Sequence, residues 1–164
     1  MLIRTASLDD AAAVADIYAH HVLHGTGTFE EVPPQPEEMA ARMVKVLAKD
    51  WPWLVAEGED GTIAGYAYAT QFRDRAAYRF SCENSVYVRE GLRGKGIGGA
   101  LLEALVAASA RAGFRRMFAV IGDSANSGSI ALHRRFGFHD AGLLEQAGCK
   151  FGRDLDVIFM ARAL

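Results

Sequence analysis

The sequence has little of what marks disulfide-rich, membrane-spanning or secreted proteins. Its two cysteines, Cys82 and Cys149, have no CxxC spacing, so we expect two reduced thiols rather than a disulfide framework. No run approaches the roughly 20 apolar residues that cross a bilayer, and the first residues lack the apolar stretch of a signal peptide. These absences predict a cytoplasmic protein that does not insert into a membrane.

An excess of one charge is also missing. The chain has 18 Lys and Arg against 20 Asp and Glu, a formal net charge of -2, so no overall field draws it onto nucleic acid or an anionic membrane. What the chain does have is apolar material, because 51% of its 164 residues are hydrophobic. With no linker, repeat or low-complexity segment, residues 1–164 are expected to form a single domain with its own core.

Hydrophobic periodicity divides the chain into helices and strands in the order β-α-α-β-β-β-α-β-α-β-β. Ser7 and Asp10 form a capping-box-like helix start, Asp60-Gly61 marks a hairpin turn, and Gly137 ends the last helix. We therefore predict a mixed α/β domain, with antiparallel strands first and one parallel crossover in the second half. Strands are expected at Leu2–Ala6, Trp53–Glu57, Ile63–Thr70, Phe80–Val88, Arg116–Ile121, Phe138–Leu144 and Asp156–Arg162, and helices from Ser7 to Gly25, over Pro36–Lys49, from Ile97 to Gly113 and over Asn126–Phe136.

A glycine-rich loop precedes the third helix. Its residues place backbone N–H groups without side chains at a helix start, which is an arrangement that binds phosphate. A Cβ would hold a pyrophosphate away from those amides, and the two basic side chains add positive charge. The loop reads Arg93-Gly94-Lys95-Gly96-Ile97-Gly98-Gly99.

Other interpretations of this loop remain open. Gly94, Gly96 and Gly99 also satisfy GxGxxG, with Asp123 downstream as a ribose ligand, as in nicotinamide-dinucleotide proteins. However, that motif usually follows the first strand and needs several further βαβ units, for which too few residues remain. A glycine-rich turn without a ligand is the third interpretation. His20 and His24, spaced i, i+4, lack a third ligand, so we predict no metal site.

Two motifs resemble the GNAT superfamily of N-acetyltransferases. The family's cofactor loop, Arg/Gln-x-x-Gly-x-Gly/Ala, is matched by Arg93, Gly96 and Gly98, and its second signature is similar to the segment from Asn126 to Phe138. Further likeness to the phosphinothricin and methionine sulfoximine acetyltransferase branch lies in Glu83–Val88, Leu132–Arg135 and Lys150–Asp156.

This resemblance implies a GNAT-like fold, a mostly antiparallel sheet flanked by about four helices. It also implies acetyl-CoA as acetyl donor and a homodimer. The expected acceptor is the α-amino group of a small amino-acid-like compound, of the phosphinothricin, methionine sulfoximine or methionine sulfone class. A peptide or protein N-acetyltransferase and a non-catalytic acyl-CoA sensor are the alternatives.

Two residues are predicted to be catalytic. Glu83 lies in an apolar strand on the face of Ser85 and Tyr87, and a carboxylate there is costly unless it is solvated or paired. Together with the resemblance, this indicates a general base that takes the amine proton. His133 shares an inward helix face with Ile130. The resemblance places His133 where many GNAT enzymes carry a tyrosine acid, and leaves open whether it protonates sulfur, orients substrate or packs.

The resemblance also distributes the binding roles. Acceptor contacts are expected from Arg73 and Tyr78 in the loop before Glu83, from Ser85 and Glu83 themselves, and from Phe29 in the first long loop. Arg73 would hold a carboxylate through charge-assisted hydrogen bonds. Asn126 is both a helix N-cap and an expected coenzyme contact. The full set of expected coenzyme contacts is Val86, Tyr87, Val88, Arg93, Gly94, Lys95, Gly96, Ile97, Gly98, Gly99, Asn126 and Ser129.

Overall fold

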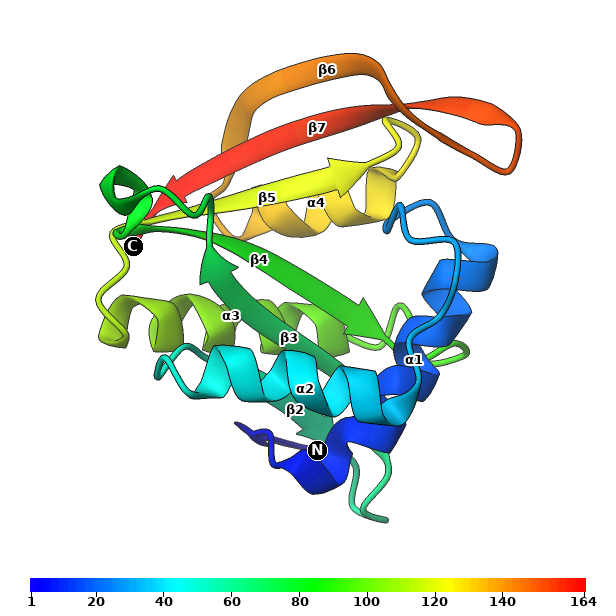
Figure 1. Ribbon diagram of the computed structural model, residues 1–164, viewed down its shortest axis with the longest axis vertical. Helices are drawn as coiled ribbons and strands as arrows, with labels where there is room; N and C mark the ends of the chain where they lie inside the picture. The colour runs from blue at the N-terminus through cyan, green and yellow to red at the C-terminus, as the bar shows by residue number, and fades with distance from the viewer.

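The computed structural model describes residues 1–164. Its strands pair into one seven-stranded sheet of order β1-β2-β3-β4-β5-β7-β6 (Figure 1). Neighbouring strands are antiparallel except β4 and β5, which are parallel. The predicted mixed sheet with one parallel crossover is therefore confirmed. The strands are β1 Leu2–Thr5, β2 Trp53–Glu57, β3 Ile63–Gln71, β4 Ser81–Val88, β5 Arg116–Gly122, β6 His139–Lys150 and β7 Arg153–Ala163.

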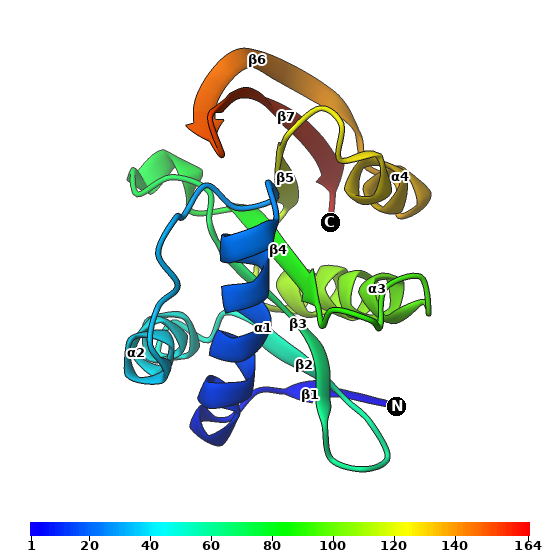
Figure 2. The ribbon, with the colours of Figure 1, turned by 90° about the vertical axis from the view of Figure 1, so that its right-hand side faces the viewer.

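Four α-helices cover the two faces of this sheet. Figure 2 shows α1 and α2 on one face and α3 and α4 on the other. Two buried clusters match these layers: one joins α1 and α2 to Trp53 and Tyr66, and the other joins α3 to Cys82 and Met117. The helices are α1 Ala11–His24, α2 Pro36–Leu47, α3 Ile97–Arg111 and α4 Ser127–Arg135, with short 3-10 turns η1 Leu8–Asp10 and η2 Ala76–Tyr78.

The start of the first helix follows the predicted capping pattern. The backbone N–H of Ser7 donates to Asp10 Oδ2 at 2.8 Å, and Arg4 pairs with the same carboxylate. The first turn is the 3-10 element η1, and the α-helix follows from Ala11. None of the helices combines the length and apolar character that a membrane crossing demands.

The closing hairpin is longer than predicted. β6 continues past Leu144 to Lys150, and β7 begins at Arg153 rather than Asp156. The prediction was wrong because pairing shifts register between Leu144 and Gly148, where Gln146 has a φ of 52°, and such irregularities break the period-2 pattern. Both turn residues have positive φ, 53° at Phe151 and 69° at Gly152, the backbone of a two-residue hairpin turn.

The fold opens between β4 and β5. These strands pair only from Ser81 opposite Arg116 to Asn84 opposite Ala119, and they then diverge toward their C-terminal ends (Figure 1). The second half of β4 therefore has one edge that pairs with no strand. Free backbone groups in the sheet need other partners, so this fork is the natural place for a ligand.

Candidate active site

A cavity of about 1000 Å³ fills the fork. Its walls are the second half of β4, the end of β5, the start of α3 and the inner face of α4. All the expected coenzyme contacts line it except Lys95, whose exposed side chain lies outside. His133 and Ser85 line it as well. The fold thus brings together residues that are far apart in the sequence.

The glycine loop reaches the cavity at the N-terminus of α3. Gly94 and Gly96 have φ values of 76° and 84°, and a Cβ added to either would meet no protein atom within 4 Å. Gly96 is the N-cap of α3, so the first amides of this helix lack intrahelical partners. The loop therefore presents free N–H groups and the positive end of a helix to an open space, which suits a pyrophosphate.

The next two glycines serve packing as well. A Cβ at Gly98 would lie 3.5 Å from Leu132, and one at Gly99 would lie 3.4 Å from Phe136. Both contacts join α3 to α4. Asn126 caps α4 as predicted, because its side chain accepts a hydrogen bond from the Ser129 backbone N–H at 3.3 Å.

Val86, Tyr87 and Val88 form the part of β4 that does not pair with β5. At this edge the Val88 carbonyl already has a partner, because His21 Nε2 lies 2.9 Å from its oxygen. His21 lines the cavity and was not predicted as a site residue; its only sequence signal was its place one turn after Tyr18 on the apolar face of α1. Burial lowers the pKa of His21, so at neutral pH the ring is uncharged and can donate to this carbonyl.

His133 is held from both sides. It is 4% exposed, with Nδ1 2.8 Å from the Ser129 carbonyl and Nε2 3.0 Å from Asn84 Oδ1. Asn84 in turn donates from Nδ2 to the Phe118 carbonyl at 3.0 Å. Both ring nitrogens thus face acceptor oxygens, which favours the doubly protonated ring, whereas burial lowers the pKa of His133. To give a proton to a ligand, the ring would have to release one of these contacts.

Asn84 is a further residue of the site, beyond those expected from the sequence. It lies on the apolar face of β4 with Cys82 and Val86, at the last residue pair before β4 and β5 diverge. A polar side chain in an apolar alternation is the same signal that indicated Glu83. Asn84 connects both strands of the fork to α4, because its two amide atoms contact Phe118 on β5 and His133 on α4.

Glu83 lies on the opposite face of β4, toward α1 and α2. Arg73 Nη1 is 3.4 Å from Glu83 Oε2. Burial raises the pKa of Glu83, and Arg73 opposes this effect. A raised pKa brings a carboxylate closer to the value that suits a general base near neutral pH. Glu83 does not line the large cavity, but its neighbour Ser85 does.

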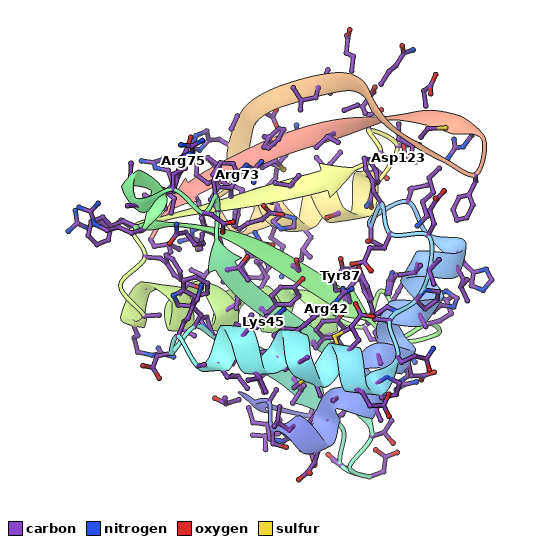
Figure 3. The ribbon with its side chains drawn as sticks, viewed as in Figure 1. Arg42, Lys45, Arg73, Arg75, Tyr87 and Asp123 are labelled. Carbon is purple, nitrogen blue, oxygen red and sulfur yellow. The ribbon has the colours of Figure 1, made fainter.

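Arg73 and Tyr78, two of the expected acceptor contacts, lie near Glu83 and do not line the cavity, whereas Phe29 lies against Gly122 at the end of β5. Tyr78 packs edge-on against Phe72, with ring centroids 5.8 Å apart, and Phe72 stacks on Phe118. Arg73 lies over the Phe72 ring. Figure 3 shows Arg73 and Arg75 together in the loop before β4, while Tyr87 lies nearer the end of that strand. The loop thus places its arginines near the N-terminal end of β4, where Glu83 lies.

A second hollow of about 250 Å³ lies between α2 and the sheet. Arg42 and Lys45 of α2, labelled in Figure 3, line it, and Arg42 is paired with Glu30 and Glu38. Thr70, which pairs with Glu83 across β3 and β4, also lines it. The remaining lining residues are Tyr18, Met39, Val46, Trp53, Tyr66 and Tyr68.

The two histidines considered as metal ligands lie close together on α1. The rings of His20 and His24 are 4.9 Å apart, and His20 Nε2 is 3.1 Å from Glu90. The structure contains no group of three or more His, Cys, Asp or Glu side chains placed to hold a metal ion.

Comparison with known proteins agrees with this geometry. The model of the acetyltransferase (GNAT) family matches residues 19–138. A phosphinothricin N-acetyltransferase of Alcaligenes faecalis is 48% identical over 162 residues, 99% of this chain and 82% of that protein. An L-methionine sulfoximine/L-methionine sulfone acetyltransferase of Pseudomonas paraeruginosa is 39% identical, over 96% of this chain and 91% of that protein.

Among solved structures, a phosphinothricin acetyltransferase of Sinorhizobium meliloti in complex with acetyl-CoA superposes with a TM-score of 0.96. It is 47% identical, and the match covers 99% of this chain and 88% of that one. The fold expected from the sequence is therefore confirmed in a relative that binds the expected coenzyme.

Proposed function

The chain belongs to the GNAT family of acetyltransferases, and on this premise we propose that it transfers the acetyl group of acetyl-CoA to the α-amino group of small amino-acid-like compounds. The acceptors are of the phosphinothricin, methionine sulfoximine or methionine sulfone class, which the names of its relatives specify. The observation that carries the proposal is the fork between β4 and β5. The backbone amides of Gly94–Gly99, which we call the glycine nest, lie at one end of it, and Ser85, beside Glu83, lies on its wall.

The residues of the fork fit acetyl-CoA. When bound, this coenzyme supplies an acetyl group activated as a thioester. The amides at Gly94–Gly99 would hold its pyrophosphate, with Arg93 beside them. The free edge of Val86–Val88 would orient the pantetheine arm and polarise the acetyl carbonyl by a backbone N–H. Asn126 and Ser129 border the same space from α4.

On the acceptor side, Glu83 would take the proton from the substrate ammonium or amine, directly or through water. As the N–C bond forms, the C–S bond of the thioester would break, and the leaving thiolate would take up a proton to give the free thiol. Arg73 would bind the acceptor's carboxylate, and Tyr78, Phe29 and Ser85 would complete the pocket. Because these groups supply proton transfer and orientation, the proposed direct transfer needs no metal. His133 and Asn84 would keep the fork in shape for the reaction.

The assembly and location belong to the same proposal. Strand β6 is at the edge of the sheet and exposes Leu143 and Leu144, each about half exposed. Apolar side chains on a free edge strand support a homodimer. Cys82 and Cys149 are both unpaired, which suits a reducing compartment such as the cytoplasm.

The test is thiol release from acetyl-CoA with a panel of acceptors: phosphinothricin, methionine sulfoximine, methionine sulfone, ordinary amino acids and short peptides. We expect release with the first three, each acetylated on nitrogen as seen by mass spectrometry. Turnover of peptides alone would replace the proposal with a peptide acetyltransferase. Coenzyme binding without thiol release from any acceptor would favour an acyl-CoA sensor.

Glu83→Gln tests the mechanism within the same assay. General-base catalysis contributes about 10²- to 10⁴-fold, so we expect kcat to fall by at least about 100-fold while the acetyl-CoA affinity, measured by calorimetry, stays within twofold. Glu103→Gln, on the surface of α3, is the matched control and should leave kcat unchanged. A Glu83→Gln enzyme with normal kcat would remove Glu83 from the mechanism.

A further inference from the structure

Lys150 is a buried lysine to which the proposed reaction assigns no catalytic role. The side chain is 2% exposed, and its Nζ donates to two backbone carbonyls, those of Gly25 and Thr28, each at 2.8 Å. No carboxylate forms an ion pair with it, although Glu31 and Glu30 are near enough to oppose the lowering of its pKa by burial. Burying an ammonium is costly, so these two hydrogen bonds must offset much of that cost.

The two carbonyls belong to the segment Gly25–Glu30, which links α1 toward α2 and contains no regular secondary structure. Gly25, Thr26 and Gly27 line the large cavity, and Glu30 pairs with Arg42 on the α2 side. This segment therefore borders the fork and reaches Arg42, which lines the second hollow together with Thr70, the partner of Glu83 across β3 and β4. Lys150 ties it to the end of β6, about 120 residues later in the chain.

Phe29 is held in place by packing against two glycines. Its ring lies against Gly122 at the end of β5 and Gly148 on β6. A Cβ at Gly122 would come within 2.8 Å of Phe29 Cε1, and a Cβ at Gly148 would overlap the ring. Neither glycine has positive φ, so both positions need glycine for space rather than for backbone conformation. We call this pair the glycine socket.

Two side-chain contacts complete the arrangement. Thr26 Oγ1 donates to Asp123 Oδ2 at 3.0 Å, and the hydroxyls of Tyr18 and Thr28 are 2.7 Å apart. Figure 3 shows Asp123 at the end of β5, beside this segment. The segment is thus fixed to β5, β6 and α1 at once, while Phe29 stays 39% exposed and available to a ligand.

We propose that Lys150 is a positioning residue for the amine acceptor. Together with the glycine socket it holds Gly25–Glu30 so that the exposed edge of Phe29 forms a fixed wall of the acceptor site. This inference rests on the proposed function, and it assigns Lys150 to acceptor binding within one chain. A wall that moves by about 1 Å can cost up to 100-fold in reaction rate.

The test compares Lys150→Met, which keeps the apolar stem but removes the donors, with Gly148→Ala, which displaces Phe29 while leaving Lys150 intact. With methionine sulfone as acceptor, both variants should raise the acceptor KM about tenfold and leave the KM of acetyl-CoA within twofold. The double variant should be little worse than either single one, because both act on the same segment. Lys49→Met, at an exposed lysine, is the control.

Hydrogen exchange provides a second measurement that does not depend on catalysis. Hydrogen exchange of the Gly25–Glu30 amides should be faster in both variants and unchanged in Lys49→Met. If the wild-type chain acetylates no acceptor, the proposed function fails, and the exchange data still decide whether Lys150 holds the segment. Unchanged exchange, or a normal acceptor KM in a folded Lys150→Met protein, would overturn the inference.

Discussion

At the scale of single residues, the site depends on side chains whose charge is set by their neighbours. Glu83 is partly buried, which raises its pKa, and Arg73 at 3.4 Å opposes this rise. The same Arg73 is the proposed carboxylate binder, so an acceptor that engages it would weaken its effect on Glu83. Binding of the acceptor would then make Glu83 a stronger base when the amine arrives.

Replacing Arg73 should therefore change the pH dependence as well as the affinity. A general base acts in its deprotonated form, so kcat/KM rises with pH through the pKa of Glu83 in the free enzyme. Arg73→Met removes the cation that lowers this pKa, and the rising limb should move to higher pH. The measurement is the pH profile of kcat/KM with methionine sulfone. Arg111→Met, at the end of α3, should keep the wild-type profile, and an unmoved limb in Arg73→Met would contradict the coupling.

Asn84 supports a prediction about stability. In Asn84→Ala, His133 Nε2 and the Phe118 carbonyl both lose their partner. Leaving buried polar groups unpaired costs about 1–3 kcal/mol each, so the free energy of unfolding in urea should fall by at least about 1 kcal/mol. Gln35→Ala removes a similar amide at an exposed position without a side-chain cap bond and should have little effect. Equal stability of the two variants would show that Asn84 does not hold the fork.

At the scale of elements, the N-terminus of α3 is where the sequence was most informative. The glycine spacing and the following amphipathic pattern correctly predicted a loop and a helix start, because both follow from local backbone chemistry. Capping by Ser7 and Asp10 and by Asn126 was predictable for the same reason. The end of β6 was not, since its register shifts depend on pairing with β7.

The same contrast holds for the site. Glu83 stood out because a carboxylate in an apolar strand needs an explanation. Lys150 stood out only as part of the family likeness in Lys150–Asp156, and His21 did not stand out, because a lysine at a hairpin end and a histidine on a helix are ordinary in a sequence. The fold shows that Lys150 holds the carbonyls of Gly25 and Thr28 and that His21 contacts the Val88 carbonyl. Contacts between distant segments are invisible to periodicity, so positioning residues are harder to predict than loops.

The two ends of α3 provide a matched pair for testing the glycine nest. Gly96 before the helix and Gly113 after it both have positive φ, 84° and 94°, and a Cβ on either would meet no protein atom within 4 Å. Gly96→Val and Gly113→Val should thus cost similar backbone strain. Only Gly96→Val should lose acetyl-CoA binding by calorimetry, because only that Cβ enters the proposed phosphate site. Retained affinity in Gly96→Val, or equal loss in both, would contradict the nest.

At the scale of the whole molecule, the fork joins two parts of the sheet. Strands β1 to β4 and strands β5 to β7 meet through the short parallel pairing that ends at Asn84 and Ala119. The walls of the large cavity come from both parts. A ligand that fills this cavity would therefore contact both parts and add interactions across the junction between them.

Acetyl-CoA should consequently stabilise the chain against heat. A ligand at 100 times its Kd adds about 2.7 kcal/mol when it binds only the folded state, and domains of this size gain about 2–4 °C in Tm per kcal/mol. We expect the Tm to rise by about 5–10 °C at that concentration, measured by scanning fluorimetry. NAD at the same concentration is the control for the GxGxxG interpretation. A ligand raises the Tm only when it binds the folded state more tightly than the unfolded state. A rise with NAD and none with acetyl-CoA would therefore mean that the nest at Gly94–Gly99 binds a dinucleotide.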